Sequence, residues 1–185
     1  MAAEPPSPTT RERRSLQALI RIHDLRRMVR RRDDESAALQ GPATGLREGL
    51  IALARRYAVR DVYVFGSRAV EIAARVRGSG AVPRGPLDTD VDIGVRPRHG
   101  VQLDVHDRVA LTLALEQLFD ASRVDLVVLP EAGAFLALAA VSGELLYCED
   151  ATDQAEYELY VLRRAGDLLP FERERRELIL KHGAR

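Results

Sequence analysis

Two short stretches constrain the fold of this chain more than any others, because each joins a strand-like apolar run to residues that a buried strand does not need. The first, residues 62–68 (VYVFGSR), ends its apolar run abruptly at Gly66 and Ser67. The second begins DVDIGV and carries Asp90 and Asp92 with one residue between them. Side chains alternate faces along a strand, so both carboxylates project to the same side. The pattern predicts two strands whose polar ends form one site.

The residue types at these strand ends are those that hold a metal ion and a phosphate. Two carboxylates this close repel each other and raise each other's pKa. Mg²⁺ removes the conflict, because proteins bind it through one or two carboxylates together with substrate phosphates. A glycine at a strand end lets the backbone approach a ligand, and a helix that follows points its N–H groups at an anion. The combination is typical of nucleotidyl or phosphoryl transfer.

A third apolar run, residues 124–129 (VDLVVL), carries a single carboxylate at Asp125. If this strand lies beside the one with the paired acids, three acids converge on one patch. Such a patch suits two metal ions that share carboxylates. The alternative is that all three are strand-end acids that simply face water. One acid fits that alternative well, whereas three acids with Gly-Ser upstream fit it poorly.

Together these motifs resemble the minimal nucleotidyltransferases of the polymerase-beta superfamily, and within it the MNT-type antitoxins of HEPN/MNT toxin–antitoxin pairs. The matching motifs are FGSRA from Phe65, TDVDI from Thr89 and VDL from Val124. The resemblance runs from about Gly45 to the C-terminal helices. It implies an α/β (α+β) nucleotidyltransferase fold, in which helices flank a small mixed β-sheet.

The resemblance also implies an activity, a partner and a set of site residues. MNT antitoxins use ATP to attach AMP to a tyrosine of a HEPN ribonuclease toxin, which silences it, and we expect an oligomeric complex with such a toxin. Asp125 would help to deprotonate the incoming hydroxyl, whereas Arg68 would either contact a phosphate or pair with an acid. The implied residues are Gly66, Ser67 and Arg68 for ATP, and Asp90, Asp92 and Asp125 for catalysis and a two-ion Mg²⁺ site.

Two other functions stay open on the sequence. Aminoglycoside nucleotidyltransferases share the Gly-Ser and paired-acid pattern, but they generally carry a substantial second domain for the acceptor, and only a short segment follows Asp150. The other alternative is a non-catalytic antitoxin that blocks its toxin by binding alone. The intact acids argue against it, because a protein that only binds has no use for a repulsive cluster.

Composition divides the chain into three predicted parts. Residues 1–43 are an arginine-rich extension and linker, flexible or partly helical. The extension is either a solvated segment or a basic helix that contacts RNA or an acidic partner. Residues 44–150 form the predicted nucleotidyltransferase domain. Residues 151–185 form a C-terminal helical segment that Pro170 is expected to interrupt.

Apolar spacing predicts the helices that connect the strands. One should begin directly after the glycine–serine pair. The loop after it, residues 76–87, is rich in glycine and proline and makes this spacer longer than is usual in the family. A later helix should be capped by Asp104. The residues expected to form its apolar stripe are Val105, Val109, Leu113 and Leu118.

Charge and composition limit the partners and the cellular compartment expected for this chain. The 185 residues include 28 basic and 28 acidic side chains, so no global positive field predicts nucleic acid as the main partner. Cys148 is the only cysteine, which excludes an internal disulfide and suits a reducing compartment. No apolar run approaches the length of a membrane span. We therefore expect a cytoplasmic protein without membrane association.

Overall fold

The computed structural model describes residues 43–78 and 90–182. Nearly all of the predicted N-terminal extension and of the glycine- and proline-rich loop lies outside these ranges. The described elements belong to one compact unit. In chain order they are α2 (Ala43–Arg56), β1 (Val59–Phe65), the 3₁₀ turn η1 (Gly66–Arg68), α3 (Ala69–Arg77), β2 (Val91–Pro97), α4 (Val105–Phe119), β3 (Val124–Val128), the 3₁₀ turn η2 (Leu129–Glu131), α5 (Ala134–Val141), β4 (Glu144–Cys148) and α6 (Ala151–His182).

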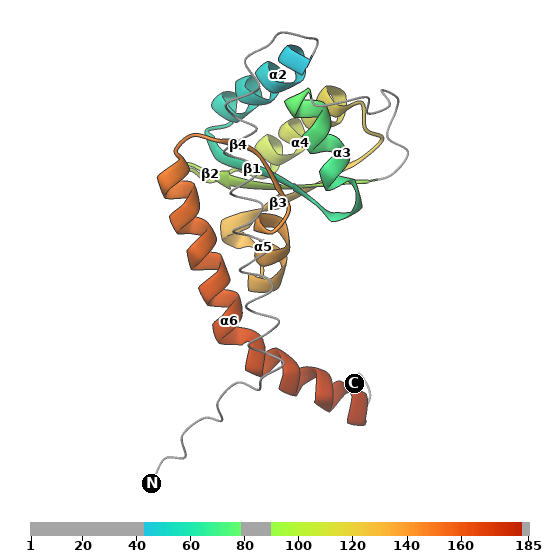
Figure 1. The fold of residues 1–185 in the computed structure, drawn as a ribbon, viewed down its shortest axis with the longest axis vertical. Coiled ribbons are helices and arrows are strands. Elements are labelled where there is room, and N and C mark those ends of the chain that lie inside the picture. Colours follow the sequence, from blue (N-terminus) through green and yellow to red (C-terminus); the bar gives the residue numbers. More distant parts are fainter. Residues whose placement is uncertain (1–42, 79–89, 183–185) are drawn as a thin grey trace. The chain divides into compact units, whose positions relative to one another are not determined.

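The four strands form one mixed sheet in the order β3-β2-β1-β4 (Figure 1). β1 runs antiparallel to both of its neighbours, and β2 and β3 run parallel to each other. A parallel pair needs a long crossover connection, which here contains α4. The mixed sheet with flanking helices confirms the fold class that the sequence predicted.

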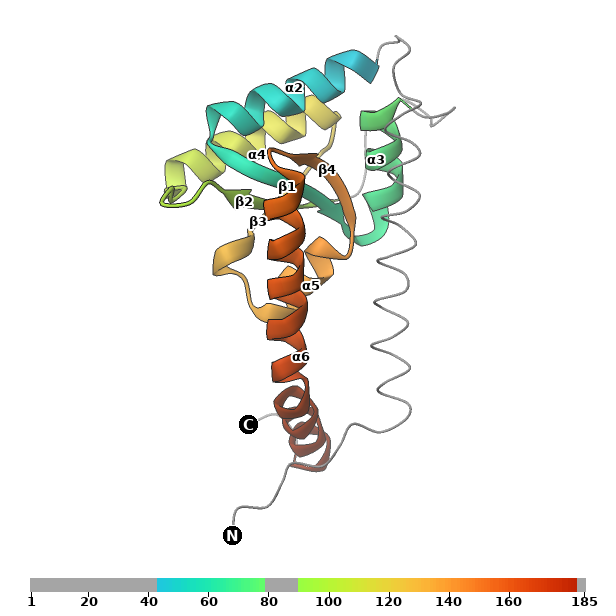
Figure 2. The ribbon, with the colours of Figure 1, turned by 60° about the vertical axis from the view of Figure 1, so that its left-hand side comes forward.

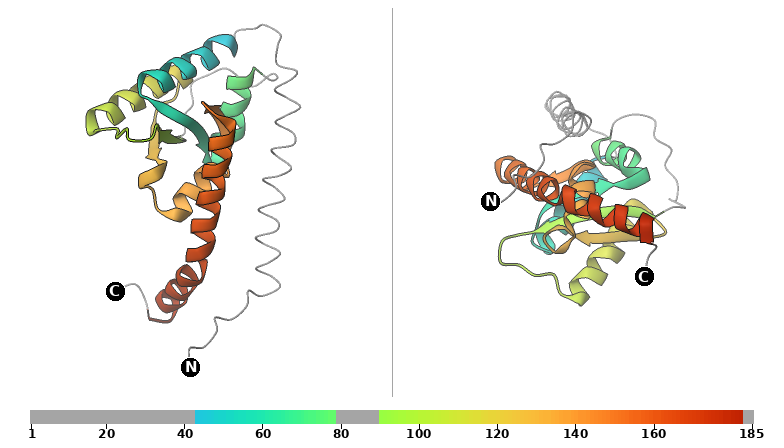
Figure 3. Two further views of the ribbon diagram at one scale, coloured as in Figure 1. Left: turned by 90° about the vertical axis from the view of Figure 1, so that its left-hand side faces the viewer. Right: turned by 90° about the horizontal axis from the view of Figure 1, so that it is seen from below.

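Helices cover both faces of the sheet (Figures 2 and 3). Alternate residues of β1 separate the two cores: Val62 and Val64 pack in the cluster shared with α2, α3 and α4, whereas Tyr63 and Phe65 pack in the cluster shared with α5 and α6. The same alternation along β2 buries its valines and isoleucine under α2, α3 and α4. Its other face, toward α5 and α6, carries in succession Asp92, Gly94 and Arg96.

Of the predicted apolar stripe of α4, only Leu118 packs against the core. Val105, Val109 and Leu113 are 79%, 55% and 53% exposed. The buried side chains of this helix are instead Leu111, Leu115 and Phe119. Apolar residues four apart occur on two faces of α4, so the spacing alone could not select the one that meets the sheet.

The C-terminal segment differs from its prediction in one respect. Pro170 does not divide it into two helices, because α6 is continuous from Ala151 to His182 with the proline inside. A proline removes one intrahelical hydrogen bond and clashes with the preceding turn, which bends a helix but lets it resume. Figure 1 shows α6 changing direction in its lower part. Among the described residues, no helix has the length and apolar character required to cross a bilayer.

Candidate nucleotide and metal site

Gly66 marks the turn from β1 into η1 and α3. Its φ of +74° lies in the left-handed region, and a Cβ at this position would stand 2.2 Å from Asp92 Oδ2. A glycine is therefore required both for the backbone conformation and for the close approach of a carboxylate. Gly66 and Ser67 are exposed at this end of the sheet. The order strand, glycine–serine, helix is the one predicted for a phosphate site.

The three predicted acids come together at the same end. Asp92 in β2 stands directly opposite Asp125 in β3 and also opposite Phe65 in β1. Asp90 immediately precedes β2. Burial raises the pKa of Asp92 above its ordinary value, and the neighbouring charges of Asp125 and then Asp90 raise it further. The cluster therefore carries more negative charge than its surroundings neutralise.

Arg123, to which the sequence assigned no role, lies within this cluster. Its guanidinium is 3.5 Å from Asp90 Oδ2 and 2.8 Å from Asp125 Oδ1. The Val91 N–H donates to the Arg123 carbonyl at 3.0 Å, which places the Arg123 backbone beside the start of β2. One sequence signal could have found it: a basic residue two positions before Asp125 shares that residue's face if the strand pattern extends to it.

Arg68 has an acid as its neighbour in this structure. Its guanidinium is 2.9 Å from Glu71, which also pairs with Arg75 at 2.9 Å. The Arg68 Nε has no hydrogen-bond partner among the described residues. Of the two partners predicted for Arg68, a phosphate or an acid, the structure shows an acid. Contact between Arg68 and a nucleotide stays a prediction.

The donor set fits a hard divalent cation. Three carboxylates supply only oxygen ligands, which Mg²⁺ prefers, and the missing Cβ of Gly66 leaves room against Asp92. The carboxylate oxygens of the three predicted acids do not all lie within 4.8 Å of one another; within the described ranges, the group of three potential ligands that does is Asp104, His106 and Asp107. That group is a helix cap: Asp104 Oδ1 accepts the Asp107 N–H at 2.7 Å, as predicted for the start of α4.

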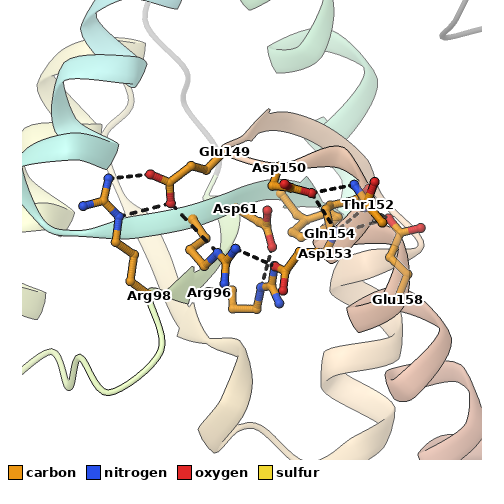
Figure 4. A network of polar contacts seen from close by, with 11 residues as sticks. Asp61, Arg96, Arg98, Glu149, Asp150, Thr152, Asp153, Gln154 and Glu158 are labelled. Carbon is orange, nitrogen blue, oxygen red and sulfur yellow. Dashed lines mark hydrogen bonds and ion pairs between the residues drawn. The ribbon is translucent and has the colours of Figure 1, made fainter.

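A second polar cluster occupies the opposite end of the same sheet face (Figure 4). Asp61 in β1 accepts a hydrogen bond from Arg96 in β2 at 2.5 Å, and Arg96 also binds Asp153 in α6. The Tyr157 ring lies 4.5 Å from the Arg96 guanidinium. Burial raises the pKa of Asp61 to about 6, although Arg96 opposes the shift. These contacts hold the start of α6 on the sheet, and no sequence pattern predicted them.

Further along α6 the cluster continues into the core. The Tyr63 hydroxyl accepts a hydrogen bond from Gln154 at 2.8 Å and donates one to Glu158 at 3.4 Å. Burial raises the pKa of Tyr63 well above its ordinary value. Arg96, Asp153 and Tyr157 also line an open hollow of about 460 Å³. Its arginines are already paired with acids, so it offers no unmatched charge to a ligand.

Comparison with known proteins identifies the fold. No protein-family model matches this chain, and no curated protein matches it either. Solved structures do match. A chain of a toxin–antitoxin complex with AMP-PNP has a TM-score of 0.53 and 24% identity, and the match covers 75% of this chain and 98% of that one.

Two further complexes give the same result. The match to a chain of the toxin–antitoxin MntA–HepT has a TM-score of 0.52 at 22% identity, over 75% of this chain and 97% of that one. A complex of tri-AMPylated Shewanella oneidensis HEPN toxin with MNT antitoxin gives 0.51 at 23% identity, over 77% and 99%. The chain therefore shares the fold of these chains from toxin–antitoxin complexes. At this level of identity the likeness establishes the fold, so the function is argued from the site.

Proposed function

We propose that this protein is an Mg²⁺-dependent nucleotidyltransferase that acts as an antitoxin by transferring AMP from ATP to a tyrosine of a cognate HEPN ribonuclease toxin. One observation carries the proposal. The carboxylates of Asp90, Asp92 and Asp125 gather at one edge of the sheet, against a bend at Gly66 that leads into a helix. Acids that were merely strand ends facing water would not require a glycine to make room for one of them.

The glycine–serine turn would hold the triphosphate. Gly66 and Ser67 are exposed, and their backbone N–H groups stand at the start of the helical segment η1–α3. Backbone N–H groups at the start of a helix and the helix dipole favour negative charge at this position. Arg68 would add a charged donor if it exchanges Glu71 for a phosphate oxygen.

The acids would hold the metal and receive the proton. Mg²⁺ bound by Asp90, Asp92 and Asp125 would polarise the phosphate oxygens and neutralise the charge of the leaving pyrophosphate. Asp125 would take the proton of the attacking tyrosine hydroxyl. The tyrosine oxygen then bonds to the α-phosphorus as the bond from that phosphorus to the β-phosphate bridging oxygen breaks. Positioning and electrostatics supply most of the acceleration in such transfers.

The comparisons support the choice of nucleotide and acceptor. One matched complex contains AMP-PNP, and another contains a HEPN toxin that carries AMP groups beside an MNT antitoxin.

The test is an incubation with Mg²⁺, α-³²P-labelled ATP and the protein encoded by the neighbouring gene. We expect label on a tyrosine of that protein, and none when the label is on the γ-phosphate, because AMP carries only the α-phosphorus. Asp90→Asn and Asp125→Asn should abolish labelling. Asp104→Asn is the matched control, since asparagine also caps helices and this acid belongs to the other acidic group.

The remaining outcomes contradict the proposal in distinguishable ways. Label on an aminoglycoside in place of the protein would indicate a small-molecule nucleotidyltransferase. A stable complex with the neighbouring protein that forms without transfer, and equally well with Asp90→Asn, would indicate an antitoxin that acts by binding alone.

A further inference from the structure

The guanidinium of Arg123 lies between Asp90 and Asp125, where a metal ion bound by these two acids would also lie. Its guanidinium reaches Asp90 Oδ2 at 3.5 Å and Asp125 Oδ1 at 2.8 Å, and its Nε also donates to Asp125 Oδ1 at 2.9 Å. Asp92, which faces Asp125 across the two strands, makes no ion pair with any described residue. One arginine thus neutralises the two outer acids and leaves the middle one without a counter-charge.

The contacts of Arg123 are easily exchanged. Its side chain is 62% exposed, and the side chains of Asp90 and Asp125 are 51% and 42% exposed. Ion pairs in such solvated positions add little to stability, because water screens the attraction and ordering a long side chain opposes it. The backbone of Arg123 is held more firmly, through the bond from the Val91 N–H and the adjacent start of β3. A fixed backbone with a loosely held charged head permits the head to move locally.

The same contact conflicts with the proposed chemistry. Asp125 is to receive a proton from the incoming hydroxyl, yet its Oδ1 already accepts two hydrogen-bonding nitrogens of Arg123. A carboxylate oxygen contacted in this way is already occupied when a metal ion arrives. The guanidinium must therefore move before the site can act, and the nearest incoming negative charge would be the triphosphate.

We propose that Arg123 bridges Asp90 and Asp125 before a ligand binds, and that its side chain moves so that the guanidinium contacts the triphosphate when a metal-bound nucleoside triphosphate enters. The inference rests on the proposed function. A guanidinium suits both states, because its planar donors match carboxylate and phosphate oxygens equally well. Arg123 thereby neutralises the two outer acids without metal and adds to nucleotide binding with it.

The experiment measures metal and nucleotide binding separately on the full-length chain. Mn²⁺ binding without nucleotide is followed by the electron paramagnetic resonance signal of the free ion, and AMP-PNP binding with Mg²⁺ by calorimetry. For Arg123→Gln we expect Mn²⁺ to bind about two- to fivefold tighter, since a weak competing cation is gone. The same variant should bind Mg²⁺ with AMP-PNP about tenfold more weakly, since a charged phosphate donor is gone.

Two further variants make the result specific. Arg123→Lys keeps the charge but loses the planar guanidinium, so its Mn²⁺ affinity should stay near that of the wild type. Its AMP-PNP affinity should lie between those of the wild type and Arg123→Gln. Asp92→Asn should lose Mn²⁺ binding whatever residue stands at 123. Because Arg123 is exposed, the thermal midpoint of each variant at this position should match that of the wild type.

The proposed role of Arg123 requires that its replacement by glutamine strengthens Mn²⁺ binding and weakens AMP-PNP binding. A purely structural arginine would leave both affinities unchanged or weaken both when replaced, and either result overturns the role given to Arg123. If the wild type binds Mn²⁺ and AMP-PNP but Arg123→Gln does so identically, the proposed function stands and this inference fails. If the wild type binds neither ligand, the proposed function fails and this inference fails with it.

Discussion

The two ends of one sheet face both carry clusters of acids but differ in how many arginines pair with them. At the site end, Asp90, Asp92 and Asp125 share the single arginine Arg123. At the opposite end, the acids Asp61, Glu149 and Asp153 meet three arginines, Arg60, Arg96 and Arg98. Both clusters are built on neighbouring strands of the same fold, so the difference lies in charge balance and not in architecture.

β2 carries both clusters on one face and shows how they are kept apart. Asp92 lies near its start and Arg96 near its end, with Gly94 between them on the same face. A Cβ on Gly94 would come within 3.0 Å of Leu129 and 3.1 Å of Ala140, so apolar side chains pack closely over the middle of the strand. This packing separates a solvated, acid-rich end from a buried, balanced one.

The contrast separates groups kept for chemistry from groups kept for stability. A balanced cluster satisfies its charges internally, as the contacts of Arg96 do, and needs no ligand. An unbalanced cluster stores repulsion that an added cation would relieve, and functional sites are where such local conflicts are expected. The predictions below change the charge balance at each end in turn.

The largest effect is expected from Asp92→Asn, which removes one negative charge from the acid-rich site end. AMP transfer should fall by about a thousandfold, because a charged group that stabilises the transfer is lost. The metal-free protein should become more stable, because the carboxylate whose pKa is raised by burial and by Asp125 and Asp90 is replaced by a neutral group. We expect the thermal midpoint to rise by about 2–5 °C in calorimetry without metal. A lower midpoint would show that Asp92 is a structural acid like those at the other end.

Arg96→Met should have the opposite profile. Removing one partner of a buried pair leaves Asp61 without its direct counter-charge, so the free energy of unfolding in urea should fall by about 3–5 kcal/mol. Transfer activity per folded molecule should be unchanged. The double variant Asp61→Asn/Arg96→Met should recover most of the loss, since it leaves neither charge buried. A single and a double variant of equal stability would mean that the pair is not the structural element we describe.

The pH dependence of the unfolding free energy should also differ between the two ends of the sheet face. At the end where acids and arginines are paired, Asp61 determines it. Its pKa rises from 3.8 to about 6 on folding, so between these values the folded state binds more protons than the unfolded state. The stabilisation is complete below about pH 4 and is lost as the pH rises through 6. Relative to Asp61→Asn, the wild type should lose roughly 2 kcal/mol of unfolding free energy between pH 4 and pH 6.5. Urea titrations of both chains at several pH values measure this difference, and a flat difference would contradict the shift.

More of the candidate site than of the rest of the molecule could be predicted from the sequence, because its residues form short local motifs. Gly66 and Ser67 are adjacent, and Asp90 and Asp92 are two apart, so alternation along a strand places each pair without knowledge of the fold. Asp125 needed one long-range assumption, that its strand neighbours that of Asp92, and the register confirms it. The metal-binding and nucleotide-binding roles of these residues stay predictions until a ligand is measured.

What the sequence did not predict depends on pairings between distant segments. Asp61, Arg96 and Asp153 lie on three separate elements, and none has a recognisable spacing to the others. A lone acid in an apolar strand carries no sign of whether it meets an arginine or water. The face of α4 was missed for a related reason, since Leu113 and Leu115 are equally apolar and only the position of the sheet decides which is buried.

The smallest effect is expected at the exposed margin of the balanced cluster. Arg98 binds Glu149 through two hydrogen bonds of 2.6 and 3.1 Å, but its side chain is 42% exposed. Because water competes for both groups, Arg98→Gln should lower the unfolding free energy by less than about 1 kcal/mol and leave transfer unchanged. Urea denaturation beside Arg96→Met makes the comparison within one network. A loss as large as that of Arg96→Met would show that charge balance as a whole, and not burial of the Asp61–Arg96 pair, holds α6 on the sheet.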